Sequence, residues 1–498
     1  MVSKLPKASH IPLAEKAASF LTNSPDPFHA VYHVIQRLQE AGFVGLASHR
    51  PWTGLVQAGG KYYYTVESST VVAFTVGPKF QGGQQPFGFH LIGGHTDSPN
   101  LKIKPRSKKT ASGCTLLGVE CYGGGLWHTW FDRDLSVSGR VLIRGKKDGN
   151  DDNGKIQQRL VKLVDPIARI STLCIHLQSA EERVAFNVNK ENHTAPIVAT
   201  TKIASEANEQ AKAVLEEGAN AQINAVDSAW REGHEPLLLQ AIAEELKVNV
   251  EDIIDFELNL YDTQPAALGG ITKEFLYSAR LDNLATVFCA TEALCHHATT
   301  DTDSADVSVM VAFDHEEVGS VSAQGAGSPV MKEAIERIAA ALNGGSALSP
   351  DLYNACIRNS FILSIDQAHA IHPNYASKHE AMHSPQLNAG VVIKTNNNQR
   401  YATSGMTGFV VRELGRLAGI PIQEFVVRND CPCGSTIGPT VSALTGIRTV
   451  DAGMPQLSMH SCREVMGIMD LYHGVELFKT FYARFRELDS KISKEIEA

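Results

Sequence analysis

The sequence lacks the features that mark several protein classes. No uncharged apolar run approaches the roughly 18 residues that a membrane span needs. There is no basic surplus either, because 45 Lys and Arg residues stand against 54 Asp and Glu residues. The resulting net charge of -9 argues against a nucleic-acid backbone as the main partner, since binding a backbone displaces counterions with basic side chains. With 43% hydrophobic and 20% charged residues, the composition is globular rather than disordered or fibrous.

Two further absences concern the compartment. The nine cysteines, scattered from Cys114 to Cys462, form no disulfide-like framework and are typical of a protein in a reducing compartment. The first residues, Met1 to Ala14, contain no apolar stretch of the kind that a secretory signal requires. We therefore expect a cytoplasmic protein. A chain of 498 residues is too long for one ordinary core, so two or three structural units are expected.

The order of apolar patterns along the chain predicts an α/β fold. Helical spacing runs through residues 14–42 with a break at Ser24–Pro27, and strand patterns follow at 61–67, 70–77 and 87–92. After residue 260, buried strands alternate with amphipathic helices: strands at 307–313, 361–365 and 422–427, and helices at 284–298, 331–342, 404–417 and 465–485. This alternation predicts a mixed sheet with helices on both faces.

The middle third of the chain has a different texture. It contains the Gly123-Gly124-Gly125 turn, a strand pair near 135–144, and a polar loop at 146–154 that we expect to be a hairpin tip. The simplest architecture is an α/β catalytic domain built from residues 1–99 and 257–498. Residues 100–256 would then form an inserted domain.

Residues able to bind metal lie where predicted strands end, the edge at which open α/β sheets place their ligands. They are His95 and Asp97, then Asp282 before a helix, Glu316 and Glu317, Asp366, and finally His460. Two histidines and three carboxylates from this set suit zinc or a similar divalent ion. One ion takes three ligands and water, so five ligands suggest two ions, about 3.5–4 Å apart, sharing a carboxylate. Singly, each residue has a plainer interpretation: a strand-end histidine is often structural, and Asp282 could be only a helix N-cap.

The adjacent residues Glu316 and Glu317 could have different roles, one as a metal ligand and the other as a base. Successive residues leaving a strand point in different directions, so one carboxylate can bind metal while its neighbour faces water and acts as a base. Asp97 stands two residues after His95 and would orient the imidazole through its other ring nitrogen. The alternative is a solvated acidic turn.

Taken together, nine short stretches resemble the M18 metallopeptidases, and they occur in order from residue 94 to residue 461. They are Gly94–Pro99, Tyr122–Trp127, Trp130–Leu135, Tyr261–Pro265, Arg280–Asn283, His315–Ser320, His372–Tyr375, Arg428–Asp430 and Pro455–Ser461. The resemblance covers essentially the whole chain.

The resemblance implies a role for each site residue. One Zn2+ ion would be held by His95, Asp282 and Asp366, and a second by Asp282, Glu317 and His460. Asp282 would bridge the two ions, and Glu316 would be the general base. Glu316 and Asp97 would be the catalytic residues. Substrate contacts would come from Glu316, Asp366, His369, Lys394 and Tyr401. A further contact, His176, would reach in from a neighbouring subunit.

The family fold implied is an α/β catalytic domain with an inserted β-rich dimerisation domain, assembled as a tetrahedral homododecamer. The activity implied is aminopeptidase action on peptides, and Lys394 favours substrates with an acidic N-terminal residue, Asp or Glu, because its amine would pair with the substrate carboxylate. An enzyme that prefers neutral residues such as Leu is the first alternative. A scaffold, or a cargo of a vacuolar delivery route whose metals only hold the fold, is the second.

Three local patterns have competing interpretations. Lys394 stands beside a polar turn and could simply be exposed to solvent. His176 could be a core histidine on an apolar strand at 173–177. The stretch 379–383 matches the H-E-x-x-H zincin signature, but Pro373 and Pro385 leave little room for the helix that such a site needs, so we expect a polar loop there.

Overall fold

The computed structural model describes residues 10–82, 85–145, 155–216 and 225–493, and the chain divides into two compact units. The larger unit consists of Met1–Ser98, Ala266–Met459 and Arg463–Ala498. The smaller unit consists of Pro99–Pro265 together with the short turn His460–Cys462. The main segment of the smaller unit ends after Pro265, whereas the sequence analysis ended the inserted domain at residue 256. The difference arises because the strand Ile253–Asp262 pairs within the sheet of the smaller unit.

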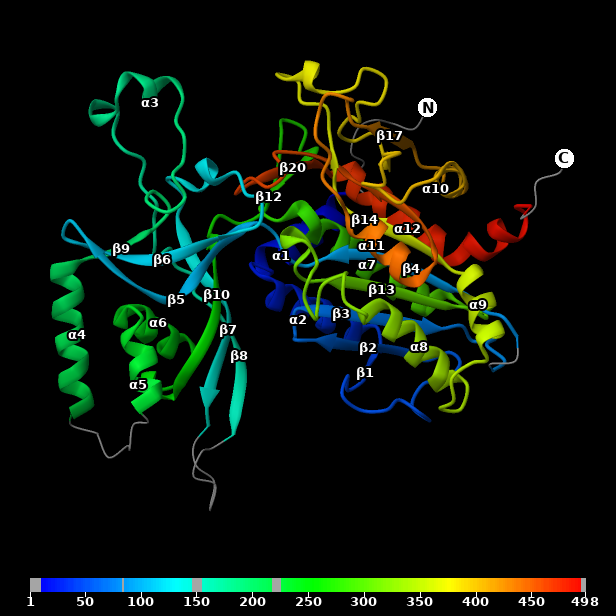
Figure 1. The fold of residues 1–498 in the computed structure, drawn as a ribbon, viewed down its shortest axis with the longest axis horizontal. Coiled ribbons are helices and arrows are strands. Elements are labelled where there is room, and N and C mark those ends of the chain that lie inside the picture. The colour runs from blue at the N-terminus through cyan, green and yellow to red at the C-terminus, as the bar shows by residue number, and fades with distance from the viewer. Residues whose placement is uncertain (1–9, 83–84, 146–154, 217–224, 494–498) are drawn as a thin grey trace. The chain divides into compact units, whose positions relative to one another are not determined.

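The larger unit is organised around a nine-stranded mixed sheet (Figure 1). Its strands lie in the order β1 (Val44–Gly45), β2 (Lys61–Val66), β3 (Thr70–Val76), β13 (Val307–Phe313), β4 (Phe89–His95), β14 (Phe361–Ile365), β18 (Arg448–Gly453), β16 (Val391–Thr395) and β17 (Ile422–Val426). The central strands β13, β4, β14 and β18 run parallel, and β13, β4 and β14 are buried throughout. Their continuous apolar runs are those of a sheet covered on both faces.

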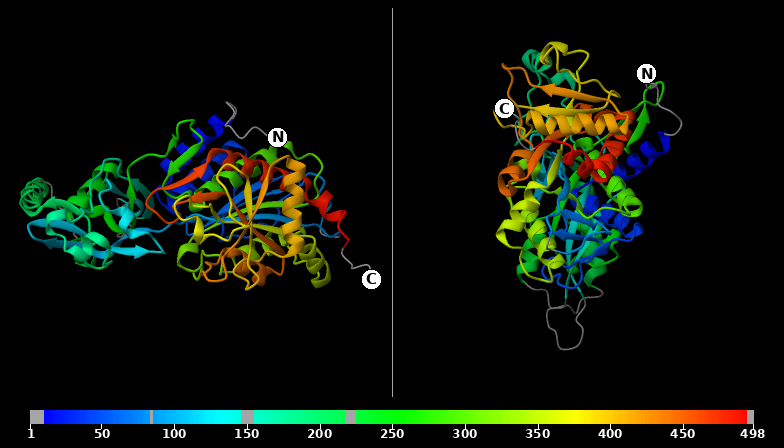
Figure 2. Two further views of the ribbon diagram at one scale, coloured as in Figure 1. Left: turned by 90° about the horizontal axis from the view of Figure 1, so that it is seen from above. Right: turned by 90° about the vertical axis from the view of Figure 1, so that its right-hand side faces the viewer.

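Helices cover both faces of this sheet, as the sequence predicts (Figure 2). One apolar core joins it to α1 (Ile11–Asn23), α2 (Pro27–Glu40), α7 (Leu281–Thr300), α10 (Gly405–Ala418) and α12 (Ile468–Ser490). A second core, on the other face, includes side chains of α8 (Val330–Leu342), α9 (Pro350–Arg358) and α11 (Ile437–Thr445). The α/β fold class is therefore confirmed. The predicted closing helix at 465–485 begins three residues late, because Glu464–Gly467 is a strand.

A second, five-stranded sheet of the larger unit has no counterpart in the sequence prediction. Its order is β11 (Ala267–Gly269), β12 (Phe275–Ser278), β20 (Glu464–Gly467), β19 (Pro455–Leu457) and β15 (Ala368–His369). These strands have two to four residues, too few for an alternating pattern to emerge.

The smaller unit is β-rich, as expected. Its six-stranded antiparallel sheet runs β8 (Ile156–Lys162), β7 (Leu135–Arg144), β10 (Ile253–Asp262), β5 (Asn100–Ala111), β6 (Cys114–Tyr122) and β9 (Ile197–Thr200). Its helices are α3 (Ala180–Val184), α4 (Thr201–Glu216), α5 (Ala225–Glu232) and α6 (Pro236–Leu246). The unit has its own apolar core, to which α6 contributes Leu238, Ile242 and Leu246. The loop predicted at 146–154 lies outside the described residues.

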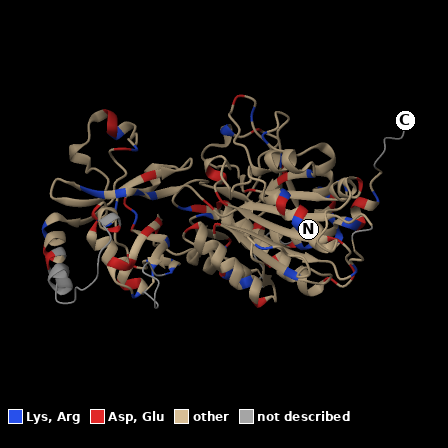
Figure 3. Cartoon of the chain, turned by 60° about the horizontal axis from the view of Figure 1, so that its bottom comes forward, with Lys and Arg blue, Asp and Glu red and all other residues tan. Residues whose placement is uncertain are grey.

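Among the described residues, no helix is long and apolar enough to cross a membrane. Acidic and basic residues are interspersed along the helices of the larger unit (Figure 3).

One buried histidine of the sheet makes stability depend on pH. His90 in β4 is 2% exposed, packs against the ring of Phe485 and lies 3.5 Å from a carboxylate oxygen of Asp306. Burial lowers the pKa of His90 to about 4, although Asp306 opposes the shift. Below its ordinary pKa of 6.5 the unfolded chain binds a proton that the folded chain does not, so the native state loses stability as pH falls from 6.5 towards 4.

We expect His90→Gln to remove this dependence. Between pH 7.5 and pH 5, the wild type should lose about 2 kcal/mol of unfolding free energy relative to the variant. Urea unfolding of both proteins at the two pH values measures the difference. Equal losses in the two proteins would show that His90 is not the responsible group.

Candidate metal centre

The register of three parallel strands brings the predicted ligands to one edge of the sheet. His95 is the last residue of β4 and pairs with Phe313, the last residue of β13. On the other side of β4, Ser364 of β14 pairs with Gly93. Because the strands end together, the segments that follow them converge at the carboxyl edge.

His95 lies at the centre of a buried cluster of carboxylates. Its Nε2 atom is 3.4 Å from Oδ1 of Asp282, 3.5 Å from Oδ1 of Asp366 and 3.9 Å from Oε2 of Glu316. Potential ligand atoms of His95, Asp282 and Glu317 all lie within 4.8 Å of one another. The larger unit thus brings together four of the five residues that the sequence analysis proposed as ligands, with Glu316 beside them.

His460 is the fifth predicted ligand, and it is the one that the larger unit does not contain. It belongs to the turn that packs with the smaller unit, where its Nδ1 atom lies 3.1 Å from the carbonyl oxygen of Gly124. The neighbouring residues Met459 and Arg463 belong to the larger unit. A role for His460 as a ligand stays a prediction.

Asp282 is held by its backbone. Its N–H donates to a carboxylate oxygen of Glu464 at 3.1 Å, and its carbonyl accepts a hydrogen bond from the Ser98 hydroxyl at 2.6 Å. Asp282 has φ -84° and ψ 105°, outside the helical region, and the peptide bond to Asn283 is cis. Oδ1 of Asp282 faces Nε2 of His95 at 3.4 Å, so Asp282 is not only a helix cap.

Two residues that support the cluster were missed at the sequence level. The side chain of Asn283 accepts a hydrogen bond from the His95 backbone N–H at 3.4 Å and donates to Oδ1 of Asp366 at 3.2 Å. Glu464, 2% exposed, fixes the backbone of Asp282. Asn283 follows Asp282 directly, so its position was a usable signal. The sequence around Glu464 contains no pattern that indicates a contact with Asp282.

Asp97 serves two parts of the site. Its backbone carbonyl lies 3.0 Å from Nδ1 of His95, and its Oδ1 atom lies 3.4 Å from the same nitrogen. Its carboxylate also accepts the backbone N–H groups of Glu316 and Glu317, each at 3.1 Å. The predicted contact with the imidazole is therefore accompanied by one that the sequence did not suggest, because Asp97 also fixes the turn that carries both glutamates.

The crowding of carboxylates shifts their proton affinities. Burial raises the pKa of Glu316 to about 8, with the negative charge of Asp366 adding to the effect against the opposing influence of His95. Burial and the nearby Asp282 raise the pKa of Glu317 well above its usual range. Burial alone would lower the pKa of His95, but the nearby carboxylates of Asp282 and Asp366 outweigh it and raise that pKa strongly.

These observations fit a site for divalent cations. Nε2 of His95 is buried and forms no hydrogen bond with any described residue. Five carboxylates surround this imidazole: Asp97, Asp282, Glu316, Glu317 and Asp366. So many buried anions are stable together only when positive charge offsets them. Nitrogen and oxygen donors in this combination are the ones that zinc binds.

The predicted substrate residues form a second cluster on β15, β16 and the loop after β16. Lys394 is 3% exposed, with its amine 3.1 Å from Oδ2 of Asp366 and 5.4 Å from the ring centre of Tyr401. Tyr401 is buried, whereas His369 is exposed and packs against the edge of the Phe425 ring at 5.7 Å. The alternative of a solvent-exposed Lys394 is therefore wrong. Its charge also acts on Asp366, whose pKa lies well below its usual range, because Lys394 and His95 outweigh the effect of burial.

His176 lies in the smaller unit, within the short 3-10 turn Ile175–Leu177. Its side chain and those of Leu173, Ile175 and Leu177 are exposed, so the alternative of a core histidine on a strand is wrong. The H-E-x-x-H stretch at 379–383 is not helical, and His383 pairs with Glu380 at 2.6 Å. As expected, it does not have the geometry of a zincin site.

Comparison with known proteins assigns a family to this arrangement. Residues 20–482 match the family described as aminopeptidase I zinc metalloprotease (M18). A probable aspartyl aminopeptidase from Ricinus communis is 45% identical over 489 residues, which cover 96% of each chain. Ape4, in a cryo-EM structure of its complex with Nbr1, has a TM-score of 0.88 and 40% identity, with 98% of this chain and 89% of that chain covered. The Saccharomyces cerevisiae mApe1 dodecamer has a TM-score of 0.79 and 29% identity, with 97% and 99% covered.

Proposed function

The chain belongs to the M18 family of zinc metallopeptidases, and from this we propose that it is a zinc aminopeptidase that removes acidic residues, Asp or Glu, from the N-termini of peptides. The observation that carries the proposal is the buried cluster of His95, Asp282, Glu317 and Asp366, with Glu316 at its edge. Relatives at 42–45% identity over nearly the whole chain are described as aspartyl aminopeptidases.

The proposed site would hold two zinc ions. His95, Asp282 and Asp366 would bind one ion, while Asp282, Glu317 and His460 would bind the other, with Asp282 shared. When bound, zinc supplies a Lewis acid that polarises the peptide carbonyl and acidifies water. Glu316 would accept the proton of the attacking water and later pass it to the leaving amine. Asp97 holds the turn that carries Glu316, so the base keeps its position while it changes charge.

Lys394 supports the preference for an acidic N-terminal residue. Its ammonium group has three donors, and the contact with Asp366 uses one of them. A buried amine left without a substrate carboxylate carries a desolvation cost, which disfavours neutral side chains. His369 precedes Lys394 in the sequence and Tyr401 follows it, and both residues would contact the substrate as well.

Comparing substrates tests this proposal. The wild type should cleave Asp- and Glu-arylamides faster than Leu-arylamide. Lys394→Met should lower kcat/KM for Asp-arylamide about 10- to 100-fold, because a charged hydrogen bond is lost, while changing the Leu-arylamide rate much less. Zinc content is measured in parallel, since Asp366 loses its partner, and Lys378→Met, at an exposed lysine, serves as the control. A clear preference of the wild type for Leu would instead support the neutral-residue alternative.

We also propose that the chain assembles as a tetrahedral homododecamer through contacts that begin at the smaller unit. Leu173, Ile175 and Leu177 are 47%, 62% and 71% exposed, an apolar segment typical of an interface. His176 lies within this segment and would reach the substrate of a neighbouring subunit. All nine cysteines are free, which agrees with residence in the cytoplasm.

A further inference from the structure

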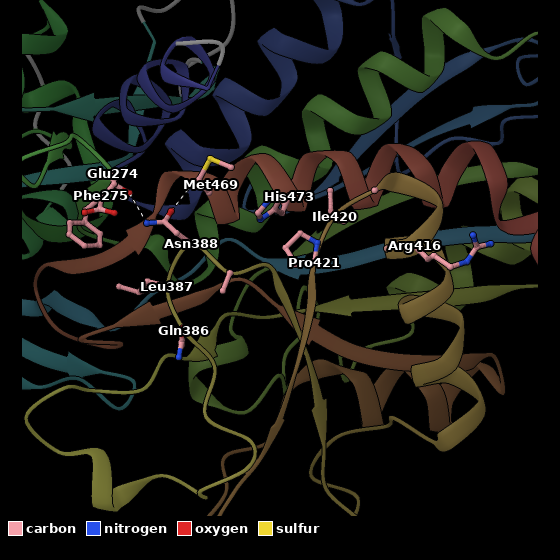
Figure 4. A pocket seen from close by; sticks show the side chains of 13 residues that line it. Glu274, Phe275, Gln386, Leu387, Asn388, Arg416, Ile420, Pro421, Met469 and His473 are labelled. Atoms are coloured by element: carbon pink, nitrogen blue, oxygen red, sulfur yellow. Dashed lines mark hydrogen bonds between the residues drawn. The ribbon is translucent and has the colours of Figure 1, made fainter. Parts of the chain in front are cut away.

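A large groove of the catalytic unit plays no part in the proposed chemistry. Its volume is about 1020 Å³, and its walls include Phe275, Leu387, Ile420, Pro421, Met469 and His473 (Figure 4). The lining comes from the start of β12, the loop before β16, the end of α10 and the first turns of α12. None of the residues proposed above as metal ligands, base or substrate contacts lines it. A cavity of this size is large enough to accept the tip of a hairpin.

Hydrogen bonds hold this groove open in a fixed shape. The side chain of Asn388 donates to the carbonyl of Glu274 at 3.2 Å and accepts from the backbone N–H of Met469 at 3.0 Å, so it ties the start of β12 to the first turn of α12 at one end of the groove. Buried Asp470 accepts the backbone N–H groups of Asn388 and Gly390. The apolar surface is therefore preorganised, which reduces the entropy lost when another group binds.

The same unit carries a protruding apolar side chain next to this groove. Ile271, at the tip of the β11–β12 hairpin, is 106% exposed, the highest value of any large hydrophobic side chain among the described residues. The preceding Gly270 has φ +80°, a conformation that glycine adopts without strain, and it keeps the turn tight. The hairpin projects Ile271 with Thr272 and Lys273, both exposed, and nothing in the described part of the subunit covers it.

We propose that Ile271 of one subunit inserts into this groove on a second copy of the chain. Apolar contact with Leu387, Ile420 and Met469 would remove the isoleucine from water. The charges are complementary as well. Arg416 at the groove is neutralised by Glu413, which leaves the charge of Glu274 to attract Lys273 of the inserted hairpin.

The inference rests on the proposed assembly and supplies a contact that the assembly needs. A two-fold interface through the smaller unit joins subunits only in pairs. Closing twelve subunits with tetrahedral symmetry requires a second interface around three-fold axes, where a protrusion of each subunit meets a different surface of the next. The hairpin tip and the groove provide such a pair of unlike surfaces, and both lie on the catalytic unit.

Charge substitutions test the contact. Ile271→Glu and Leu387→Lys should each convert the twelve-subunit particle to smaller species, because a charge would face an apolar surface. The double variant should recover the large particle, since Glu and Lys would then meet across the interface. Light scattering after size exclusion measures the assembly. Leu55→Glu, at a site 56% exposed and outside the groove, should stay fully assembled.

The outcomes separate this inference from the proposed function. Dissociated Ile271→Glu should retain zinc and turn over Asp-arylamide within about twofold per subunit, because the His176 contact belongs to the other interface. A large particle that persists in Ile271→Glu would overturn the inference and leave the enzyme assignment intact. So would a double variant that stays dissociated, because the groove would then have another occupant. A wild type that is never larger than a dimer would remove the assembly on which the inference depends.

Discussion

Replacing Glu316 by Gln is expected to lower kcat at least ~10²-fold while zinc content and assembly stay unchanged. The amide keeps the size of the carboxylate, and the backbone N–H of residue 316 still donates to Asp97. What the variant loses is the ability to accept a proton from water. Because Oε2 of Glu316 lies 3.9 Å from Nε2 of His95, the base is close to the cluster without belonging to its closest ligand group.

Two comparison variants sharpen this result. Glu333→Gln makes the same chemical change at an exposed position of α8 and should leave the rate unaltered. Glu317→Gln should instead reduce bound zinc, since Glu317 is one of the three residues whose ligand atoms converge. Rates of Asp-arylamide cleavage and zinc contents, measured on the same samples, distinguish the role of a base from that of a metal ligand. An unchanged rate in Glu316→Gln would remove this residue from the mechanism and favour the alternative of purely structural metals.

The sequence predicted the positions of the site residues best where regular strands carry them. His95 and Asp366 stand at the ends of the neighbouring buried strands β4 and β14, whose uninterrupted apolar runs are readily recognised. The turn that carries Glu316 was equally predictable, because it follows another buried apolar strand, β13. Once these strands are predicted to be parallel and adjacent, the chemistry of their carboxyl ends follows from general properties of α/β sheets.

Other parts of the site depend on tertiary contacts that no local pattern encodes. Glu464 acts on Asp282 across 182 residues of sequence, and it lies on a four-residue strand that the prediction merged with the following helix. Asn283 links β4 to Asp366 through one amide group, yet an Asn beside an Asp is common in turns. The burial of Lys394 was equally hidden, since a polar turn follows it directly.

Replacing His176 is expected to have a large effect on turnover, because this residue would link assembly to catalysis. Its side chain is exposed and lies among exposed apolar residues, an arrangement that suits a contact with another chain. A hydrogen bond from this imidazole to the tetrahedral intermediate would leave each isolated subunit with an incomplete site. Removing one such donor typically costs 10²-fold or more in kcat. We therefore expect His176→Phe to lose at least ~10²-fold in turnover while its size and bound zinc are retained.

Mixing two inactive variants tests whether the histidine acts between subunits. When His176→Phe and Glu316→Gln are combined in equal amounts and allowed to exchange, about one quarter of all sites should pair an intact base with an intact histidine from the neighbour. Activity should recover to that level. A mixture of His176→Phe with the double variant should stay inactive, because no chain then supplies His176, and His128→Phe, at another exposed histidine, should behave as wild type. Full activity in a verified monomer would contradict the shared site, since a lone subunit could not receive the imidazole of a neighbour.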